Sequence, residues 1–167
     1  MTAPGSSPQD PLKLEAFKTA LATRNLEISL FWQRSNYFLV LNTAIAVGFF
    51  SRDAHDMYAF ALSIVGLVVT VLWVRINLGS KFWQSRWEHR LRVVEDQLWP
   101  GLDLFSAEWD VIRADVEESL KNSGGWRVYN WAVLRKPSVS KTMTILSVFF
   151  VLVWIGAAVV SARHAFW

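Results

Sequence analysis

The sequence contains no cysteine, which excludes disulfide bonds, thiol nucleophiles and cysteine-ligated metals. It also lacks a Gly-rich phosphate-binding loop and any pair of histidines or carboxylates at a metal-ligand spacing such as HExxH. Its three histidines, His55, His89 and His164, fall in three different regions of the chain. These absences leave no catalytic residue, metal or other cofactor to predict, and we expect no enzymatic activity.

What the chain has in abundance is apolar sequence. Hydrophobic residues make up 53% of it and are concentrated in three runs, of which 57–74 and 142–160 approach the roughly 20 residues that cross a bilayer. The sequence therefore predicts an all-α membrane protein with three transmembrane helices and amphipathic cytosolic helices. A soluble bundle with hydrophobic core helices is the alternative, disfavoured by the length of these runs.

The pattern divides the chain into seven segments. We expect a disordered segment at 1–9, an amphipathic cytosolic helix at 10–36, a first span at 37–50 with its inner end from about 31, a second span at 57–74, a cytosolic helical region at 75–141, a third span at 142–161 and an external tail at 162–167. A short polar link, 51–56, joins the first two spans into a hairpin.

The second span continues past its apolar end without a proline, so Met57–Leu98 is predicted to form one long helix. Apolar residues recur along its second half at steps that keep them on one stripe, and we expect this stripe to pack within the chain or between copies of it. The stripe contains Trp73, Ile76, Trp83, Trp87, Leu91, Val94 and Leu98, together with Ser80. Their mean spacing does not separate a coiled coil from a straight packed helix.

A Trp-Pro-Gly sequence at 99–101 ends this helix, and a shorter helix is predicted over 103–121. The long helix is basic on its outer side, and the shorter one is acidic. We expect them to match charges within a subunit or across subunits, supplying register more than stability. The residues concerned are Lys81, Arg86, Arg90 and Arg92 on the first helix and Glu108, Asp110, Asp115 and Glu118 on the second.

Asn42 and Thr43 lie inside the predicted first span. A polar side chain there needs a partner, which a facing helix can supply. One interpretation is an interhelical hydrogen bond. The other, less favoured, is a polar lining for a pore or ligand.

The charges predict an orientation. Residues 75–141 carry 11 of the 17 Lys and Arg, whereas the 51–56 link and the tail carry one each. The positive-inside rule puts the N-terminus and 75–141 in the cytosol and the C-terminus outside. Residues 126–141, basic and aromatic, are interpreted as an interfacial collar, with binding of anionic lipid headgroups as the alternative.

Two stretches resemble known small bacterial membrane proteins. Arg34-Ser35-Asn36-Tyr37-Phe38-Leu39, then Leu41-Asn42-Thr43-Ala44, resembles the "R-x-N-x-F-L-x-L-N-T" start of the first span in RipA-type octameric membrane proteins and in the related two-span SLATT-like effector modules. Trp73, Ile76, Asn77, Lys81-Phe82 and Glu95 are similar to the helix that leaves their second span. The chain departs from them in lacking the "S-Y-R-x-L-N" wording and in its third span.

The resemblance covers about residues 30–98. It implies a bacterial inner membrane, a homo-oligomer and no enzymatic site, and for the SLATT-like group a membrane-perturbing role, as in phage defence. With the amphipathic surfaces, it favours a homo-oligomeric inner-membrane scaffold or regulatory platform that acts through its cytosolic helices. The expected partners are the lipid bilayer, further copies of the chain and a cytosolic protein of unknown identity.

Two other functions are weaker interpretations. An oligomeric channel or membrane-perturbing effector would use Asn42 and Thr43 along its path, yet the spans hold no ionisable residue, and conduction pathways usually carry some. Nucleic-acid binding through Lys81 to Arg92, with Trp83 and Trp87 interleaved, is disfavoured by the neighbouring acidic helix.

Overall fold

Five α-helices make up the chain in the computed structural model, which describes residues 11–51, 56–122, 126–135 and 138–166. They are α1 (Pro11–Phe49), α2 (Asp56–Leu98), α3 (Trp109–Asn122), α4 (Arg127–Leu134) and α5 (Val139–Phe166). No strand occurs among these residues. The segment expected to be disordered at 1–9 and most of the 51–56 link lie outside them.

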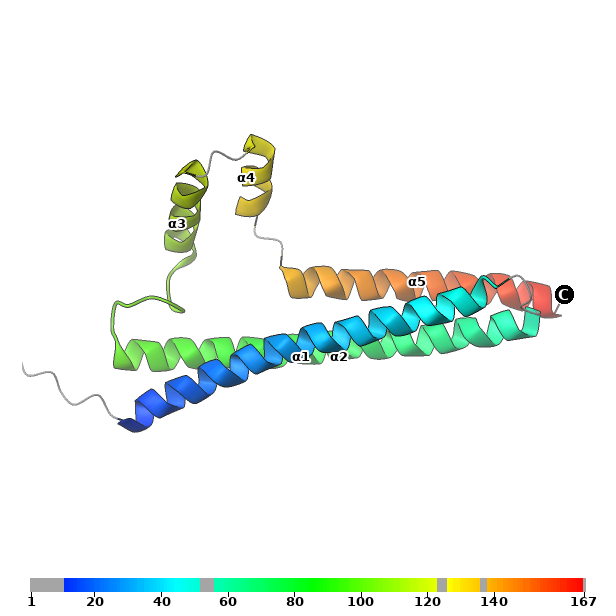
Figure 1. Ribbon diagram of the computed structural model, residues 1–167, viewed down its shortest axis with the longest axis horizontal. Helices are drawn as coiled ribbons and strands as arrows, with labels where there is room; N and C mark the ends of the chain where they lie inside the picture. The colour runs from blue at the N-terminus through cyan, green and yellow to red at the C-terminus, as the bar shows by residue number, and fades with distance from the viewer. Residues whose placement is uncertain (1–10, 52–55, 123–125, 136–137, 167) are drawn as a thin grey trace, which may run out of the picture. The chain divides into compact units, whose positions relative to one another are not determined.

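The single long helix predicted for Met57–Leu98 is confirmed, since α2 runs unbroken through all 43 of its residues. At about 1.5 Å per residue it is roughly 65 Å long, about twice the hydrocarbon thickness of a bilayer. The helix at 10–36 and the run at 37–50 are likewise one continuous helix, α1, of 39 residues. Within residues 28–82, hydrogen bonds hold α1 beside α2 (Figure 1).

The chain divides into two compact units. We call residues 28–82 with 138–167 the membrane unit, and residues 1–27 with 83–137 the head unit. The membrane unit contains α5 and the apolar halves of α1 and α2. The head unit contains the N-terminal part of α1, the C-terminal part of α2, and the short helices α3 and α4, which pack against each other (Figure 1).

Among the residues that the structure describes, two helices, α2 and α5, are long and apolar enough to span a membrane. Only 22% and 17% of their apolar windows are buried, whereas the core helix of a soluble protein would be mostly covered. This exposure favours lipid around them over a soluble bundle. The run at 37–50 is not among these candidates, because it is short and a window of spanning length within α1 must also include polar residues at 33–36. A third span therefore remains a prediction.

The helix predicted over 103–121 begins later, at Trp109. Residues 99–108 form turns instead, with positive φ angles at Gly101 (84°) and Asp103 (53°). Helical φ angles are negative, so neither residue continues a helix. The apolar periodicity from Leu102 onward was therefore misleading over its first turn.

Candidate functional site

The interior of the membrane unit is polar along one face of α2. Its buried side chains are small or hydrogen-bonding apart from one tryptophan, and they recur at steps of three and four residues. They are Ser63, Thr70, Trp73, Asn77 and Ser80, with Gly66 in the same series. Because lipid surrounds the outside, large apolar side chains can face outward and small polar ones can join the helices.

Asn42 joins all three helices of the membrane unit and is 1% exposed. Its Oδ1 accepts hydrogen bonds from the Thr70 hydroxyl on α2 (2.8 Å) and from the Trp154 indole N–H on α5 (2.9 Å). Its Nδ2 donates to the carbonyl of Phe38 on its own helix (2.9 Å). We call Asn42, Thr70 and Trp154 the Asn42 node.

The Asn42 node depends on a glycine. A Cβ built on Gly66 would lie 2.4 Å from the Trp154 ring, a distance that real Cβ atoms essentially never show. The indole therefore packs directly against the α2 backbone, where its N–H reaches Asn42. Glycine allows such close approach between helices in a membrane.

Thr43, the other polar residue predicted in the first span, is exposed and has a local partner. Its hydroxyl donates to the carbonyl of Leu39 one turn earlier (2.9 Å). This bond satisfies the hydroxyl within α1, as Thr side chains commonly do in helices. The two neighbours thus differ: Asn42 joins helices, and Thr43 faces outward.

A second set of polar contacts lies nearer the end of the membrane unit where α2 leaves its apolar segment. Asn77 Nδ2 lies 3.3 Å from the Ser147 hydroxyl and 3.4 Å from the Met143 carbonyl, both on α5. Arg34 on α1 donates to the Ser80 hydroxyl on α2 (3.2 Å). Together with the Asn42 node, these contacts show that α1 and α5 are antiparallel to α2 in the membrane unit. The residue numbers of the contacting positions on α1 and α5 fall as those on α2 rise.

In the head unit the central polar residue is Glu95, on the same face of α2 and with no exposed surface. Its carboxylate accepts hydrogen bonds from the backbone N–H groups of Leu104, Phe105 and Ser106 at 2.8–3.0 Å and from the Ser106 hydroxyl at 3.2 Å. These bonds hold the 99–108 turns against α2. Hydrogen bonds to a charged acceptor are among the stronger ones in proteins.

Aromatic side chains pack around this turn. Phe17 of α1 contacts Trp99 edge-on at 5.3 Å and Phe105 at 6.2 Å between ring centroids. The Arg24 guanidinium lies over the Phe105 ring at 5.8 Å. The Glu95 turn therefore connects α2 to the N-terminal part of α1 within the head unit.

The stripe predicted along α2 has a mixed environment. Trp73 and Leu91 are fully buried, whereas the Trp83 side chain is 46% exposed. The remaining members, Ile76, Trp87, Val94 and Leu98, are half-buried. The fully covered positions lie largely one residue further along, at Asn77, Gln84 and Glu95.

The residues predicted to match charges across helices are mostly on the surface. Lys81, Arg86, Arg90, Arg92, Glu108, Asp110, Asp115 and Glu118 are all exposed. Arg86 lies over the Trp83 ring at 5.6 Å. On α3, Arg113 pairs with Glu117 of the same helix at 3.0 Å. Charge matching between α2 and α3 remains a prediction.

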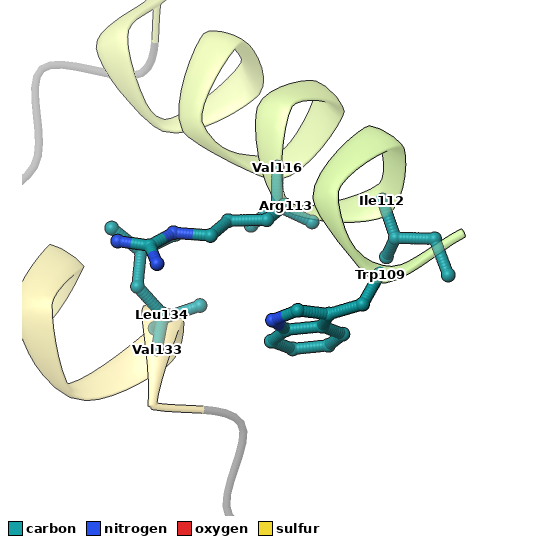
Figure 2. Close-up of a pocket in the computed structure, with 6 residues that line it drawn as sticks. All are labelled: Trp109, Ile112, Arg113, Val116, Val133 and Leu134. Carbon is teal, nitrogen blue, oxygen red and sulfur yellow. The ribbon is translucent and has the colours of Figure 1, made fainter. Parts of the chain in front are cut away.

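A pocket of about 220 Å³ lies between α3 and α4 of the head unit. Its lining is apolar except for one cation: Trp109, Ile112, Arg113, Val116, Val133 and Leu134. Figure 2 shows the Trp109 and Arg113 side chains reaching from α3 toward the end of α4. Among the residues that the structure describes, no group of three or more His, Asp or Glu could hold a metal ion.

Sequence reasoning missed the partners of Asn42 and the role of Glu95. A signal for the first was present, since Ser63, Gly66, Thr70, Asn77 and Ser80 recur at helical steps through an apolar helix. Glu95 entered only through the family resemblance. No feature of the sequence around Glu95 predicts that its carboxylate oxygens accept hydrogen bonds from backbone N–H groups nine to eleven residues further along the chain.

Comparison with known proteins gives one match. No curated protein and no solved structure matches the chain. A family model, that of the octameric membrane protein family (8xMP), matches residues 14–163. Because this match runs through all five helices and both units, the chain belongs to the octameric membrane protein family.

Proposed function

We propose that this protein is a non-enzymatic homo-oligomer of the bacterial inner membrane that serves as a scaffold or regulatory platform through its head unit. The family name supports self-association, and the exposed apolar faces of α2 and α5 support a membrane setting. An assembly of eight copies follows from the family name. The bacterial source and the inner membrane follow from the sequence resemblance alone.

The observation that carries the platform role is the apolar surface of the head unit. α4 has no buried residue; Val128 and Trp131 on it are 73% and 56% exposed, and Trp126, which precedes it, is 85% exposed. Exposed apolar surface of this kind is typical of a protein or membrane contact. We assign it to contacts with further copies or with a cytosolic partner.

We propose three spans, with α1 contributing the third through its C-terminal half. The hydrogen bonds from Asn42 to Thr70 and Trp154 support this, since they tie that half of α1 to both candidate spans. Basic residues of all three helices, Arg34, Arg75 and Lys141, lie toward the same end of the membrane unit. By the positive-inside rule that end is cytosolic, so the N-terminus is inside and the C-terminus outside.

The alternative is an oligomeric channel or membrane-perturbing effector. Asn42 and Thr43 are the residues predicted to line its path. The oxygen and nitrogen of Asn42 are already engaged within the chain, and the exposed Thr43 hydroxyl donates to the Leu39 carbonyl of its own helix. A buried, satisfied amide offers nothing to a passing ion. The geometry therefore favours the scaffold.

Ion flux through proteoliposomes separates the two functions. If the protein is a scaffold, liposomes that contain the wild type or the Asn42→Leu variant should release trapped potassium no faster than liposomes without protein. Flux well above that of empty liposomes, altered by Asn42→Leu or by Thr43→Val, would instead establish the channel.

A further inference from the structure

A groove of about 220 Å³ lies in the membrane unit between α2 and the N-terminal end of α5. Its surface is mainly apolar, and two lysines and three hydroxyl-bearing residues are among those that line it. The lining residues are Leu78 and Lys81 from α2, Ser138 just before α5, and Ser140, Lys141 and Thr144 from α5. We propose that this groove binds the phosphate-bearing headgroup of an anionic phospholipid.

The charge around the groove favours an anion. The sequence holds no Asp or Glu from Met57 to Trp87 and none after Glu118. Lys81 and Lys141 therefore bring two positive charges to one groove without a carboxylate nearby on either helix. A bound phosphate would relieve their repulsion. Lys81 already makes a contact within the chain, but an ammonium group carries three donors, so further bonds are available.

The level of the groove relative to the apolar runs of α2 and α5 favours a lipid over a soluble anion as its ligand. Lys141 directly precedes the apolar run of α5, and Arg75 directly follows that of α2. Asn77 contacts Met143 and Ser147, which brings these two ends to one level. Lipid phosphates lie just outside the hydrocarbon core, at such a level.

The surface next to the groove is suited to an acyl chain. Ile145, Phe149 and Leu152 follow Lys141 at helical steps along α5 and are 60%, 55% and 63% exposed. Leu78 on α2, which lines the groove, is also exposed. With its headgroup at the two lysines, a phospholipid would lay its acyl chain along these residues of α5. A free phosphate has no acyl chain and would make none of these apolar contacts.

Native mass spectrometry of the full-length protein in detergent, titrated with phosphatidylglycerol or phosphatidylcholine, tests the proposal. The wild type should bind phosphatidylglycerol more tightly. Lys81→Gln with Lys141→Gln should weaken that binding roughly 30-fold, from about a fivefold loss per lysine. The matched control removes two exposed lysines elsewhere, Lys13→Gln with Lys121→Gln, and should bind as the wild type does.

Three results would overturn the proposal. The first is equal binding of the two lipids by the wild type, which decides the matter even if the double variant fails to fold. The second is unchanged phosphatidylglycerol binding by the Lys81/Lys141 variant. The third is displacement of the lipid by excess glycerol 3-phosphate, which would make the groove a site for soluble phosphate esters.

Discussion

Each of the two units contains a buried polar centre, and the two centres are stabilised differently. In the membrane unit the centre is neutral: Asn42 bonds to side chains of two other helices. In the head unit it is a carboxylate: Glu95 bonds mainly to backbone N–H groups of one turn. The first joins helices that run together through apolar surroundings, and the second fixes the path of the chain after a helix ends.

This difference follows from the surroundings. Placing a charge inside a bilayer is energetically unfavourable, so hydrogen bonds between membrane-spanning helices are more easily formed by neutral amides and hydroxyls. A carboxylate can be buried where several N–H groups converge on it, provided that all are in place. We therefore expect the Glu95 centre to be the more costly one to break.

The largest effect is expected for Glu95→Ala. Three backbone N–H groups of 104–106 would lose their acceptor, at a cost of about 3–5 kcal/mol in the stability of the head unit. Hydrogen exchange followed by mass spectrometry on a peptide covering these amides should show protection in the wild type and its loss in the variant. The neighbouring exposed Asp96→Ala is the control and should leave protection unchanged. Equal protection in all three proteins would show that the carboxylate does not hold the turn.

A middle effect is expected for Gly66→Ala. The added methyl group would meet the Trp154 ring and push the indole off Asn42, at a cost of about 1–3 kcal/mol. Gly156→Ala is the matched control, because open space surrounds that position, and it should be neutral or slightly stabilising. Thermal unfolding in detergent, followed by tryptophan fluorescence, measures both. The same melting temperature for the two variants would contradict the close packing of α2 and α5.

The smallest effect separates two neighbours. Asn42→Leu removes the bonds to Thr70 and Trp154 and should cost about 1–2 kcal/mol, given roughly 0.6 kcal/mol or more for each such bond in a membrane. Thr43→Val removes only a bond within α1 and should change stability by less than about 0.5 kcal/mol. Unfolding by SDS in mixed micelles compares them. A Thr43→Val loss as large as that of Asn42→Leu would remove the special role of the node.

The long helix α2 could be predicted from the sequence because its apolar and amphipathic halves join without a proline. The face that it buries could be predicted only in part. Hydrophobicity selects Trp73 and Leu91, which are buried, but it also selects the half-buried Ile76 instead of its buried neighbour Asn77. Next to lipid, the outside is as apolar as the side chains, so polarity and small size mark the inside instead.

The turn at 99–108 was hidden for another reason. Leu102, Phe105 and Trp109 keep a helical spacing, yet the backbone takes positive φ angles at Gly101 and Asp103. The turn depends on the Glu95 carboxylate and on Phe17 of α1, which contacts Trp99 and Phe105. Tertiary contacts of this kind leave no periodic mark on the sequence.

The central claim, that the chain works as a membrane-embedded homo-oligomer, is tested most directly by its mass in solution. Mass photometry of the full-length protein in nanodiscs or detergent should give a single assembly. Eight copies of the 19.1 kDa chain amount to about 153 kDa of protein. A monomer of 19.1 kDa plus its detergent or lipid would contradict the account.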